Sequence, residues 1–411
     1  MRVAAGRWPS TDAHVDLNSS VLSAEARLLL LSAGGAENDV RIRELLGGPI
    51  DWDTLGALAA RERAEPVLWG RLRAASGGLL PAAAAPLERL ARVSEFRMLH
   101  LEQRLRESLE ALAGERLDAI LLKGAALALT VYGSFVRRPM SDVDLLLRPG
   151  TAARARAVLL ESGWTSTELE SRQEFFEGHQ HLPALEDSRG TGVRLELHTA
   201  LFFEGHPFRL SPGDVWSRAT PVIAFGQRAF VPSVHDQLLH LCLHFAWSHM
   251  MATGSWRSVR DMQMLVSTGR VSWDSFVDLA RESRGASCCY WTFRLARDLA
   301  GVAVPDVVLD ALRPPLPSFA LERLERHFAA NLFPTESVCP SVAMAYAMWR
   351  LGVRPGWSGH GRVRPWDRTD DLLFDERARM SGVRRLVAHA RNAGAWGRYF
   401  RVVLRGEGSA R

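Results

Sequence analysis

The chain has 411 residues and a formal net charge of +5, a length that suggests two or three domains and a charge that permits a polyanionic partner without requiring one. Its four cysteines lack CxxC spacing, which argues against a zinc knuckle and structural disulfides and favours a reducing, cytoplasmic setting. No segment approaches the roughly 18 uninterrupted apolar residues of a spanning helix, and the first residues lack the apolar core of a secretory signal, so we expect a soluble protein without a membrane partner.

The chain up to about residue 115 is expected to be helical. Apolar residues recur at three- and four-residue spacings in three stretches, residues 24–31, 42–46 and 52–72. Asp51 and Asp53 are candidate caps for the third of these helices. Residues 83–112 continue as one or two amphipathic helices with a charged face toward solvent.

The hydrophobic period changes near residue 117. Residues 117–124 are short, apolar and end in glycine, which is typical of a buried strand, and 125–133 suit one or two helical turns with a glycine stop. A second strand follows at 141–150, and then a helix that ends at Gly163. This order of strand, loop, helix, strand and helix indicates an α/β unit.

Residues 193–201 alternate most clearly between two faces. Val193, Leu195, Leu197 and Thr199 share one face, so Glu196 and His198 share the other with Arg194. A strand face that gathers an acid and a histidine is unusual unless it lines a site. Further strands are expected at 165–170 and 181–185.

From residue 234 the pattern returns to helix. Five helical segments are expected, at residues 234–250, 255–267, 272–285, 319–333 and 341–353. The proline-rich residues 303–317 and 355–369 are interpreted as loops, and 371–404 as a basic amphipathic ending with solvent-facing arginines rather than a nucleic-acid surface. The domain prediction is therefore a helical region at 1–115, an α/β core at 116–232 and a second helical region at 233–411.

Two aspartates at the start of the second strand are candidate metal ligands. Asp142 and Asp144 project to the same side, about 7 Å apart, with Val143 in the core between them. Carboxylates so placed can hold one Mg²⁺ or share two, as phosphoryl and nucleotidyl transfer require. The pair alone is common by chance, and Glu196 on the later strand supplies the third carboxylate of the pattern.

The segment before the aspartates offers groups for phosphate. Lys123 is the only lysine of the chain, the other fifty basic side chains being arginine, which argues for a needed ammonium. Gly124 would let backbone amides approach phosphate at the start of a helix, and Lys123 with Arg137 or Arg138 would add charge. Ser141 is a further nucleotide-binding candidate.

These motifs together resemble a known group. The stretches KGAALALTVYG and RRPMSDVDLLL, the His179-x-His181 pair and the Glu196-Leu-His198 triplet look like the polymerase-β-type nucleotidyltransferase superfamily. Within it the chain resembles the family called uncharacterised nucleotidyltransferase, some of whose members accompany peptide natural-product pathways. The resemblance covers most of the chain and implies an α/β (α+β) core with a mixed sheet, flanked by helical regions.

The resemblance also implies roles. Asp142 and Asp144 would bind Mg²⁺ or Mn²⁺ carried by a nucleoside triphosphate, Glu196 would complete the metal site and help deprotonate an acceptor, and Lys123 with Gly124 would hold the phosphates. The chain departs from the superfamily in carrying Ala125 where serine often stands, and in a longer spacing from the glycine to the first aspartate, which fits the narrower family.

Other residues are acceptor-side candidates: His181, His198, His244, Arg257 and Asp261. His240 and His244 lie four residues apart, a spacing that can ligate zinc, but without a third ligand we favour packing or substrate-facing roles. Arg257 and Asp261 would form either a surface ion pair or part of the cleft wall. His181 would orient the acceptor or cap a strand.

The function that we predict is transfer of a nucleoside monophosphate from a nucleoside triphosphate to a hydroxyl or amine. A small-molecule or peptide acceptor is favoured over nucleic acid, because no dedicated nucleic-acid module is evident. Transfer of the γ-phosphoryl group in the same cleft, toxin-like modification of RNA or protein, and nucleotide binding without turnover stay as alternatives. The intact set of Lys123, Asp142, Asp144 and Glu196 argues against the last of these.

Overall fold

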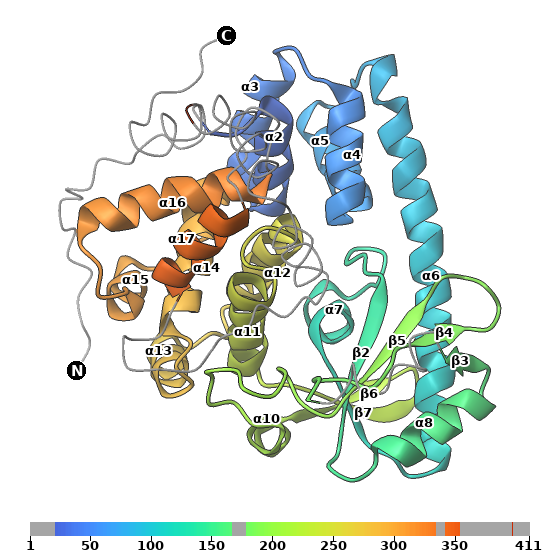
Figure 1. The fold of residues 1–411 in the computed structure, drawn as a ribbon. Coiled ribbons are helices and arrows are strands. Elements are labelled where there is room, and N and C mark those ends of the chain that lie inside the picture. Colours follow the sequence, from blue (N-terminus) through green and yellow to red (C-terminus); the bar gives the residue numbers. More distant parts are fainter. Residues whose placement is uncertain (1–20, 167–177, 334–341, 354–396, 398–411) are drawn as a thin grey trace, which may run out of the picture.

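The computed structural model describes residues 21–166, 178–333, 342–353 and 397. Within these residues no helix is both long and apolar enough to cross a membrane. The elements form a seven-stranded sheet and many helices (Figure 1). The predictions for 355–369 and 371–404 fall outside the described residues, apart from residue 397.

The N-terminal region is helical, as predicted. Its α-helices are α2 (Ala24–Ala33), α3 (Asp39–Leu46), α4 (Trp52–Glu62), α5 (Glu65–Ala75) and α6 (Ala85–Gly114). The run predicted at 52–72 divides into α4 and α5, because Arg63 adopts a left-handed conformation and Pro66 opens the next helix. Helix α6 is a single helix that extends from the N-terminal helices along the sheet (Figure 1).

Asp51 is the N-cap of α4, as predicted, and its carboxylate accepts hydrogen bonds from Asp53 N at 3.1 Å and Thr54 N at 3.0 Å. Replacing Asp51 with Ala is expected to lower the free energy of unfolding, because two backbone donors lose their partner. Asp53→Ala is the matched control, since it removes a first-turn carboxylate that makes no cap bond, at about 0.3 kcal/mol. Equal losses in urea titrations of the two variants would contradict the capping role.

The sheet has the strand order β3-β4-β5-β2-β1-β7-β6. Its strands are β1 (Ala119–Leu121), β2 (Asp142–Leu147), β3 (Trp164–Ser166), β4 (Leu185–Asp187), β5 (Arg194–His198), β6 (Thr220–Ala224) and β7 (Gln227–Val231). The pairs β2–β5 and β1–β7 are parallel and the other neighbours antiparallel, so the sheet is mixed. This agrees with the α/β class expected from the sequence.

The hairpin of β6 and β7 was not predicted, although β7 lies beside the central β1. Its turn consists of Phe225 and Gly226, both with positive φ, as a two-residue hairpin requires. Phenylalanine is an unusual first residue for such a turn, so the common Asn-Gly or Asp-Gly signal is missing. The strand predicted at 181–185 begins later than expected, since His181 forms only an isolated bridge and β4 extends from Leu185 to Asp187.

Between β1 and β2 the chain forms α7 (Lys123–Leu127) and a π-helical turn, η3 (Ala128–Tyr132), before Gly133 stops it at φ +66°. The predicted helix after β2 is α8 (Ala152–Glu161). The predicted order of strand, helical turns, strand and helix is therefore confirmed.

Helices also form the C-terminal part of the described chain. They are α10 (Pro212–Arg218), α11 (Val234–Leu243) with the π-helical turn η5 (His244–Ser248), α12 (Ser255–Ser267), α13 (Trp273–Glu282), α14 (Ala286–Ala300), α15 (Asp306–Leu312), α16 (Ser318–Leu332) and α17 (Val342–Val353). The reading of 303–317 as a loop is wrong for α15. This helix begins directly after Pro305, which cannot interrupt it there, and it buries Val308, Leu309 and Leu312.

One hydrophobic core joins the N-terminal and C-terminal helices. Helix α2 packs against α12 and α14, and Trp256 donates its indole N–H to Ser32 Oγ at 3.0 Å. Asn38 donates to Ala300 O at 2.8 Å. A second core fills the space between the sheet and the helices α6 and α8. The division into three consecutive regions stays a prediction.

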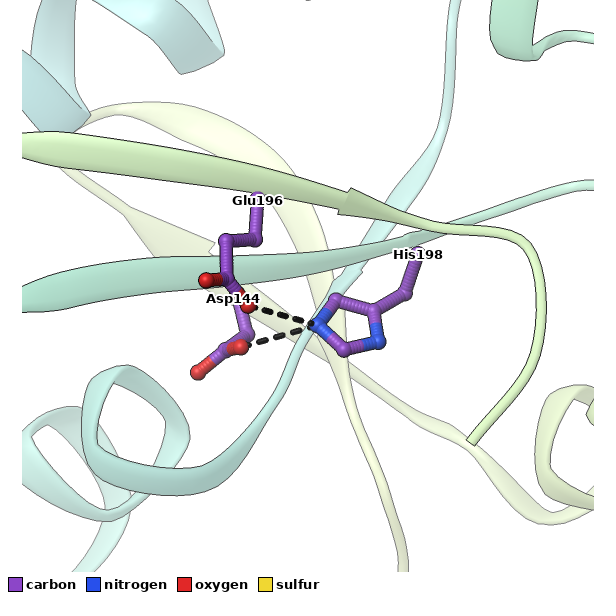
Figure 2. A group of neighbouring side chains, drawn as sticks. All are labelled: Asp144, Glu196 and His198. Atoms are coloured by element: carbon purple, nitrogen blue, oxygen red, sulfur yellow. Dashed lines mark hydrogen bonds and ion pairs between the residues drawn. The ribbon is translucent and has the colours of Figure 1, made fainter. Parts of the chain in front are cut away.

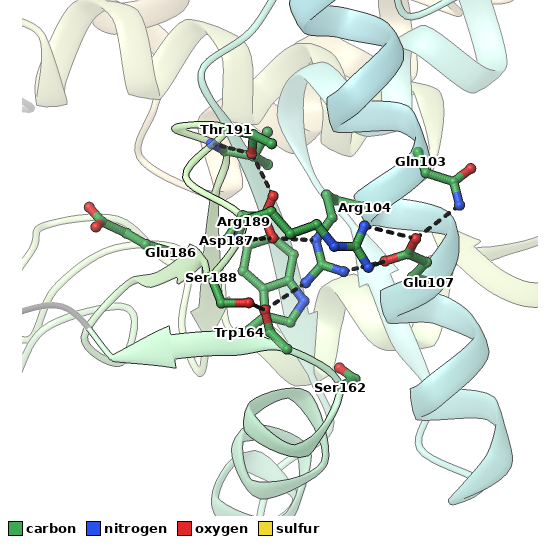
Figure 3. Close-up of polar contacts among 12 residues, drawn as sticks. Gln103, Arg104, Glu107, Ser162, Trp164, Glu186, Asp187, Ser188, Arg189 and Thr191 are labelled. Carbon is green, nitrogen blue, oxygen red and sulfur yellow. Dashed lines mark hydrogen bonds and ion pairs between the residues drawn. The ribbon is translucent and has the colours of Figure 1, made fainter.

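Arg104 fixes α6 to the sheet (Figure 3). The guanidinium is buried, pairs with Asp187 at 3.0 Å and with Glu107, and donates to Gly163 O at 3.1 Å. It also lies 4.5 Å from the ring centre of Trp164. These contacts hold α6 against the β3–β4 side of the sheet, away from the cavity described next.

Candidate active site

A cavity of about 370 Å³ lies between the sheet and the helices α11 and α12. Its volume is in the roughly 300–1,000 Å³ range of small-molecule sites. Apart from Arg137, His181 and His198, every residue given a binding, catalytic or acceptor-side role from the sequence lines it. The lining also includes residues that the sequence did not single out, among them Gln180, Gln237, His249, Gly254 and Ser258.

The pairing of β2 with β5 brings the acidic residues together. The two strands run parallel, with Asp142 opposite Arg194 and Asp144 opposite Glu196. Residues opposite each other on neighbouring strands share one face of the sheet, so the carboxylates of Asp144 and Glu196 both reach the cavity. Val143 is 1% exposed and lies in the core, as predicted.

Lys123 is held by Asp144. Its ammonium donates to Asp144 Oδ1 at 2.8 Å, and the residue has φ +46°, a left-handed conformation that is uncommon for a residue other than glycine. Burial alone would lower the pKa of Lys123, but the carboxylates of Asp144, Glu196 and Asp142 raise it above its usual value. Lys123 is therefore a fixed positive charge at the carboxylates.

His198 contacts the carboxylates of Asp144 and Glu196 (Figure 2) and does not line the cavity. Its Nε2 is 2.8 Å from Asp144 Oδ1 and 3.5 Å from Glu196 Oε2, and its Nδ1 is 3.2 Å from Ala200 O. The side chain is 1% exposed. Burial would lower its pKa, but the two carboxylates raise it. We had expected His198 on the acceptor side, and the structure instead places it against the acids.

The pKa values of the three carboxylates are shifted in different directions. Burial and the neighbouring Asp144 raise the pKa of Asp142, whose carboxylate accepts from Ser141 Oγ at 3.1 Å. Burial would also raise the pKa of Asp144, yet Lys123 and His198 lower it well below its usual value. The pKa of Glu196 is lowered as well: burial would raise it, but the hydrogen bond from His198 together with the charges of Lys123 and His181 lowers it. Asp144 and Glu196 are thus held as carboxylates.

One group of side chains in the described residues can hold a metal ion. Asp144, Glu196 and His198 each offer a ligand atom within 4.8 Å of the other two. Oxygen donors suit Mg²⁺ and Mn²⁺, and the imidazole nitrogen adds a donor that Mn²⁺ accepts more readily than Mg²⁺. Asp142, which lies two positions before Asp144 and lines the same cavity, could add a further carboxylate. The donor set therefore fits a divalent cation.

Residues 48–301 match the model of a family described as uncharacterised nucleotidyltransferase. The match spans more than half of the chain and includes the whole sheet and every residue of the cavity lining. The chain belongs to this family. Comparisons with curated proteins and with solved structures give no match.

In this nucleotidyltransferase-family chain, Arg138 is bound by Asp261 on α12. Its Nε donates to Asp261 Oδ1 at 2.6 Å and its Nη2 to Oδ2 at 2.7 Å, while Tyr132 donates to the same Oδ1 at 2.7 Å. Of the two alternatives for Arg257 and Asp261, the surface ion pair is wrong, because Asp261 is 2% exposed and pairs with Arg138 instead. The bidentate pair joins the segment before β2 to the helical wall.

Gly124 is needed for close packing as well as for any approach of phosphate. A Cβ at this position would lie 3.1 Å from Met140 Sδ and 3.3 Å from Arg138 Nη1. Ala125, where the superfamily often has serine, is 1% exposed and packs into the second core. A serine hydroxyl there would need a partner in an apolar setting.

Helix α11 presents a polar stripe to the cavity. The stripe has helical spacing: Gln237, His240 and the apolar Leu241 belong to α11, and His244 begins η5. Burial lowers the pKa of His240 to about 3 and that of His244 well below its usual value, so both rings are neutral at pH 7. His240 Nε2 and Gln237 Oε1 are buried without a protein partner, as expected of ligand-facing atoms. We favoured a packing or substrate-facing role for His240 and His244 over zinc, and both line the cavity.

His181 approaches the carboxylates from the other side. It pairs with His198 as an isolated bridge, and its Nε2 is 3.5 Å from Glu196 Oε2. Burial lowers its pKa. Its ring is 4.3 Å from that of His179, centre to centre. His181 therefore contacts Glu196 without lining the cavity.

Proposed function

We propose that this chain transfers a nucleoside monophosphate from a nucleoside triphosphate to a hydroxyl or amine, with a divalent cation. The observation that carries the proposal is the parallel pairing of β2 and β5, which sets Asp144 beside Glu196 at the floor of a cavity that also contains Asp142 and Lys123. Membership of a nucleotidyltransferase family supports the same reaction class.

In the proposed reaction the acceptor atom bonds to the α-phosphorus, and the bond from that phosphorus to the oxygen bridging to the β-phosphate breaks. Pyrophosphate leaves with that oxygen. The proton of the acceptor passes to Glu196, whose side chain is 21% exposed compared with 4% for Asp144. Lys123 keeps Asp144 ionised, and Gly124 gives the phosphates access to the start of α7.

Asp144, Glu196 and His198, with Asp142, are the residues proposed to hold Mg²⁺ or Mn²⁺. When bound, such an ion supplies positive charge that offsets the charge developing on the phosphoryl oxygens. Four carboxylates and three cationic side chains line the cavity, so a nucleotide without a cation would meet a net negative surface. This balance favours binding of the nucleotide as its metal complex.

We propose a small molecule or a peptide as the acceptor. The cavity volume supports this choice, since about 370 Å³ lies at the lower end of the range of small-molecule sites. The stripe on α11 is neutral and polar, which suits an uncharged acceptor group better than a phosphate backbone.

A cytoplasmic setting is part of the same proposal, and among the described residues the cysteines are free and buried.

The test compares transfer from α-labelled and γ-labelled ATP, GTP, CTP and UTP with Mg²⁺ or Mn²⁺. The expected result is incorporation of the α label, absent from Asp142→Asn/Asp144→Asn and retained by Asp118→Asn, a partly exposed aspartate paired with Arg148 outside the cavity. Incorporation of the γ label alone would replace nucleotidyl with phosphoryl transfer. If neither label moves, and wild type and the double variant bind the metal nucleotide equally, the proposal of catalysis fails.

Exchanging the lone lysine tests the need for an ammonium. Lys123→Arg is expected to lower kcat/KM by about 10-fold or more, because a planar guanidinium cannot take the place of a compact ammonium 2.8 Å from Asp144 Oδ1. Lys123→Met, which also removes the charge, should lower it further. Steady-state rates of both variants, with thermal unfolding to confirm folding, are the measurement. Undiminished activity of Lys123→Arg would remove the argument for an ammonium.

A further inference from the structure

We propose that Arg257 on α12 binds the terminal phosphates of the nucleotide, on the wall of the cavity opposite the carboxylates. The inference rests on the proposed function and deepens it by assigning a polyphosphate subsite. It changes our expectation for Arg257, which the sequence placed on the acceptor side, and for Arg138, which the sequence assigned to the nucleotide.

The first step is the pairing of the positive charges that line the cavity. Lys123 is bound to Asp144, and Arg138 is bound bidentately to Asp261. Within the described part of the chain, Arg257 is the cationic side chain of the lining that makes no ion pair with a carboxylate. Glu62 of α4, an acid beside the start of α12, already accepts from Trp256 N at 3.1 Å and from Arg61 Nε at 3.2 Å.

The second step is the placement of the Arg257 guanidinium. Gly254 precedes α12 with φ +68°, and a Cβ on it would lie 3.2 Å from Arg257 Nη2. A side chain at 254 would therefore be strained and would also crowd the guanidinium, which lies over the first turn of α12. Both residues line the cavity. The guanidinium is thus a largely buried charge beside open space in the cavity, and burial lowers its pKa.

The third step is that this wall offers no second unpaired charge, since Asp261 of α12 is bound to Arg138. Burial lowers the pKa of His240 to about 3 and that of His249 to about 4, so these rings are neutral at pH 7. An anion on the helical side of the cavity therefore meets one full positive charge, that of Arg257. A guanidinium without a carboxylate partner matches phosphate oxygens, which it can bind through two parallel N–H groups. Since the metal-binding acids lie on the sheet, a triphosphate would extend from them toward α12.

The experiment is calorimetric titration of the whole chain with inorganic tripolyphosphate, ATP and AMP, each with Mg²⁺. Arg257→Gln is expected to weaken the binding of tripolyphosphate and ATP by about 10- to 100-fold and to change that of AMP by less than about 2-fold, because only the first two carry terminal phosphates. Arg257→Lys should retain part of the affinity. Arg270→Gln, an exposed arginine at the end of the same helix, makes the same change of charge and should bind like wild type.

Unchanged tripolyphosphate affinity in folded Arg257→Gln would overturn the inference, as would equal losses for AMP and ATP. If Arg257→Gln does not fold, Arg257→Lys decides, and unaltered tripolyphosphate and ATP affinities in that variant would count against a guanidinium–phosphate contact. A wild type that binds none of the three ligands overturns it too. Binding of tripolyphosphate that depends on Arg257, in a protein that transfers neither the α nor the γ label, would uphold the subsite while the proposed function failed.

Discussion

Asp144→Asn is expected to lower the rate of nucleotidyl transfer by a factor of about 10³ or more. Asp144 contacts two of the neighbouring basic side chains of the site, since its Oδ1 accepts from Lys123 and is 2.8 Å from His198 Nε2. Asparagine has nearly the same shape but no charge, so it removes a proposed metal ligand and leaves the Lys123 ammonium without its ion-pair partner. The measurement is kcat with the preferred nucleotide at saturating Mg²⁺ or Mn²⁺.

Metal affinity gives this prediction a second readout. Binding of Mn²⁺, followed by electron paramagnetic resonance of the free ion, should weaken in Asp144→Asn and stay unchanged in Asp118→Asn. Thermal unfolding of both variants checks that the loss is local. An Asp144→Asn protein that retained both activity and Mn²⁺ affinity would show that the metal site lies elsewhere.

Arg138→Met is expected to lower the free energy of unfolding by about 3–5 kcal/mol. The guanidinium and Asp261 are 9% and 3% exposed, so removal of one partner leaves a buried charge without compensation. Tyr132 would then be the remaining side-chain donor to that carboxylate among the described residues. Urea titration at pH 7 measures the loss, and Arg92→Met is the control, since it breaks an exposed pair with Glu88 and should leave the urea midpoint nearly unchanged.

The double variant Arg138→Met/Asp261→Leu tests whether the loss of stability comes from the ion pair itself or from other contacts of the two residues. Replacing both charges with apolar groups avoids the unpaired carboxylate, so most of the lost stability should return. Additive losses from Arg138→Met and Asp261→Leu would contradict an energetic link between the segment before β2 and α12. Arg138 and Asp261 would then be in contact without a measurable interaction energy between them.

Much of the local structure could be predicted because it depends on neighbours in the chain. The period of two in residues 193–201 placed Glu196 and His198 on one strand face, and the same argument placed Asp142 and Asp144 together. The helical periods of the N-terminal region were recognised, as was the cap at Asp51. The errors are also local in origin: Pro305 precedes a helix here, and the turn at Phe225 lacks the common signal of a hairpin.

The partners of the charged residues could not be predicted. For Arg257 and Asp261, four residues apart on α12, the sequence left open a mutual ion pair or a place in the cleft wall. Both line the cavity, and Asp261 pairs with Arg138 from the segment before β2. His198 was expected to face an acceptor and instead contacts Asp144. Gln237 gave no signal in the sequence, because a glutamine on an amphipathic helix is ordinary until the tertiary structure leaves its Oε1 buried beside a cavity.

The sequence by itself determined which side chains share a strand or helix face, since that follows from the two- and 3.6-residue periods of regular structure. It therefore identified the aspartates of β2 and the Glu196 and His198 pair of β5, while the family was identified by the resemblance of the motifs. Only the tertiary structure decided which faces meet. The register of β2 with β5 and the packing of α12 on the core set which charges are neutralised and which, as with Arg257, are left for a ligand.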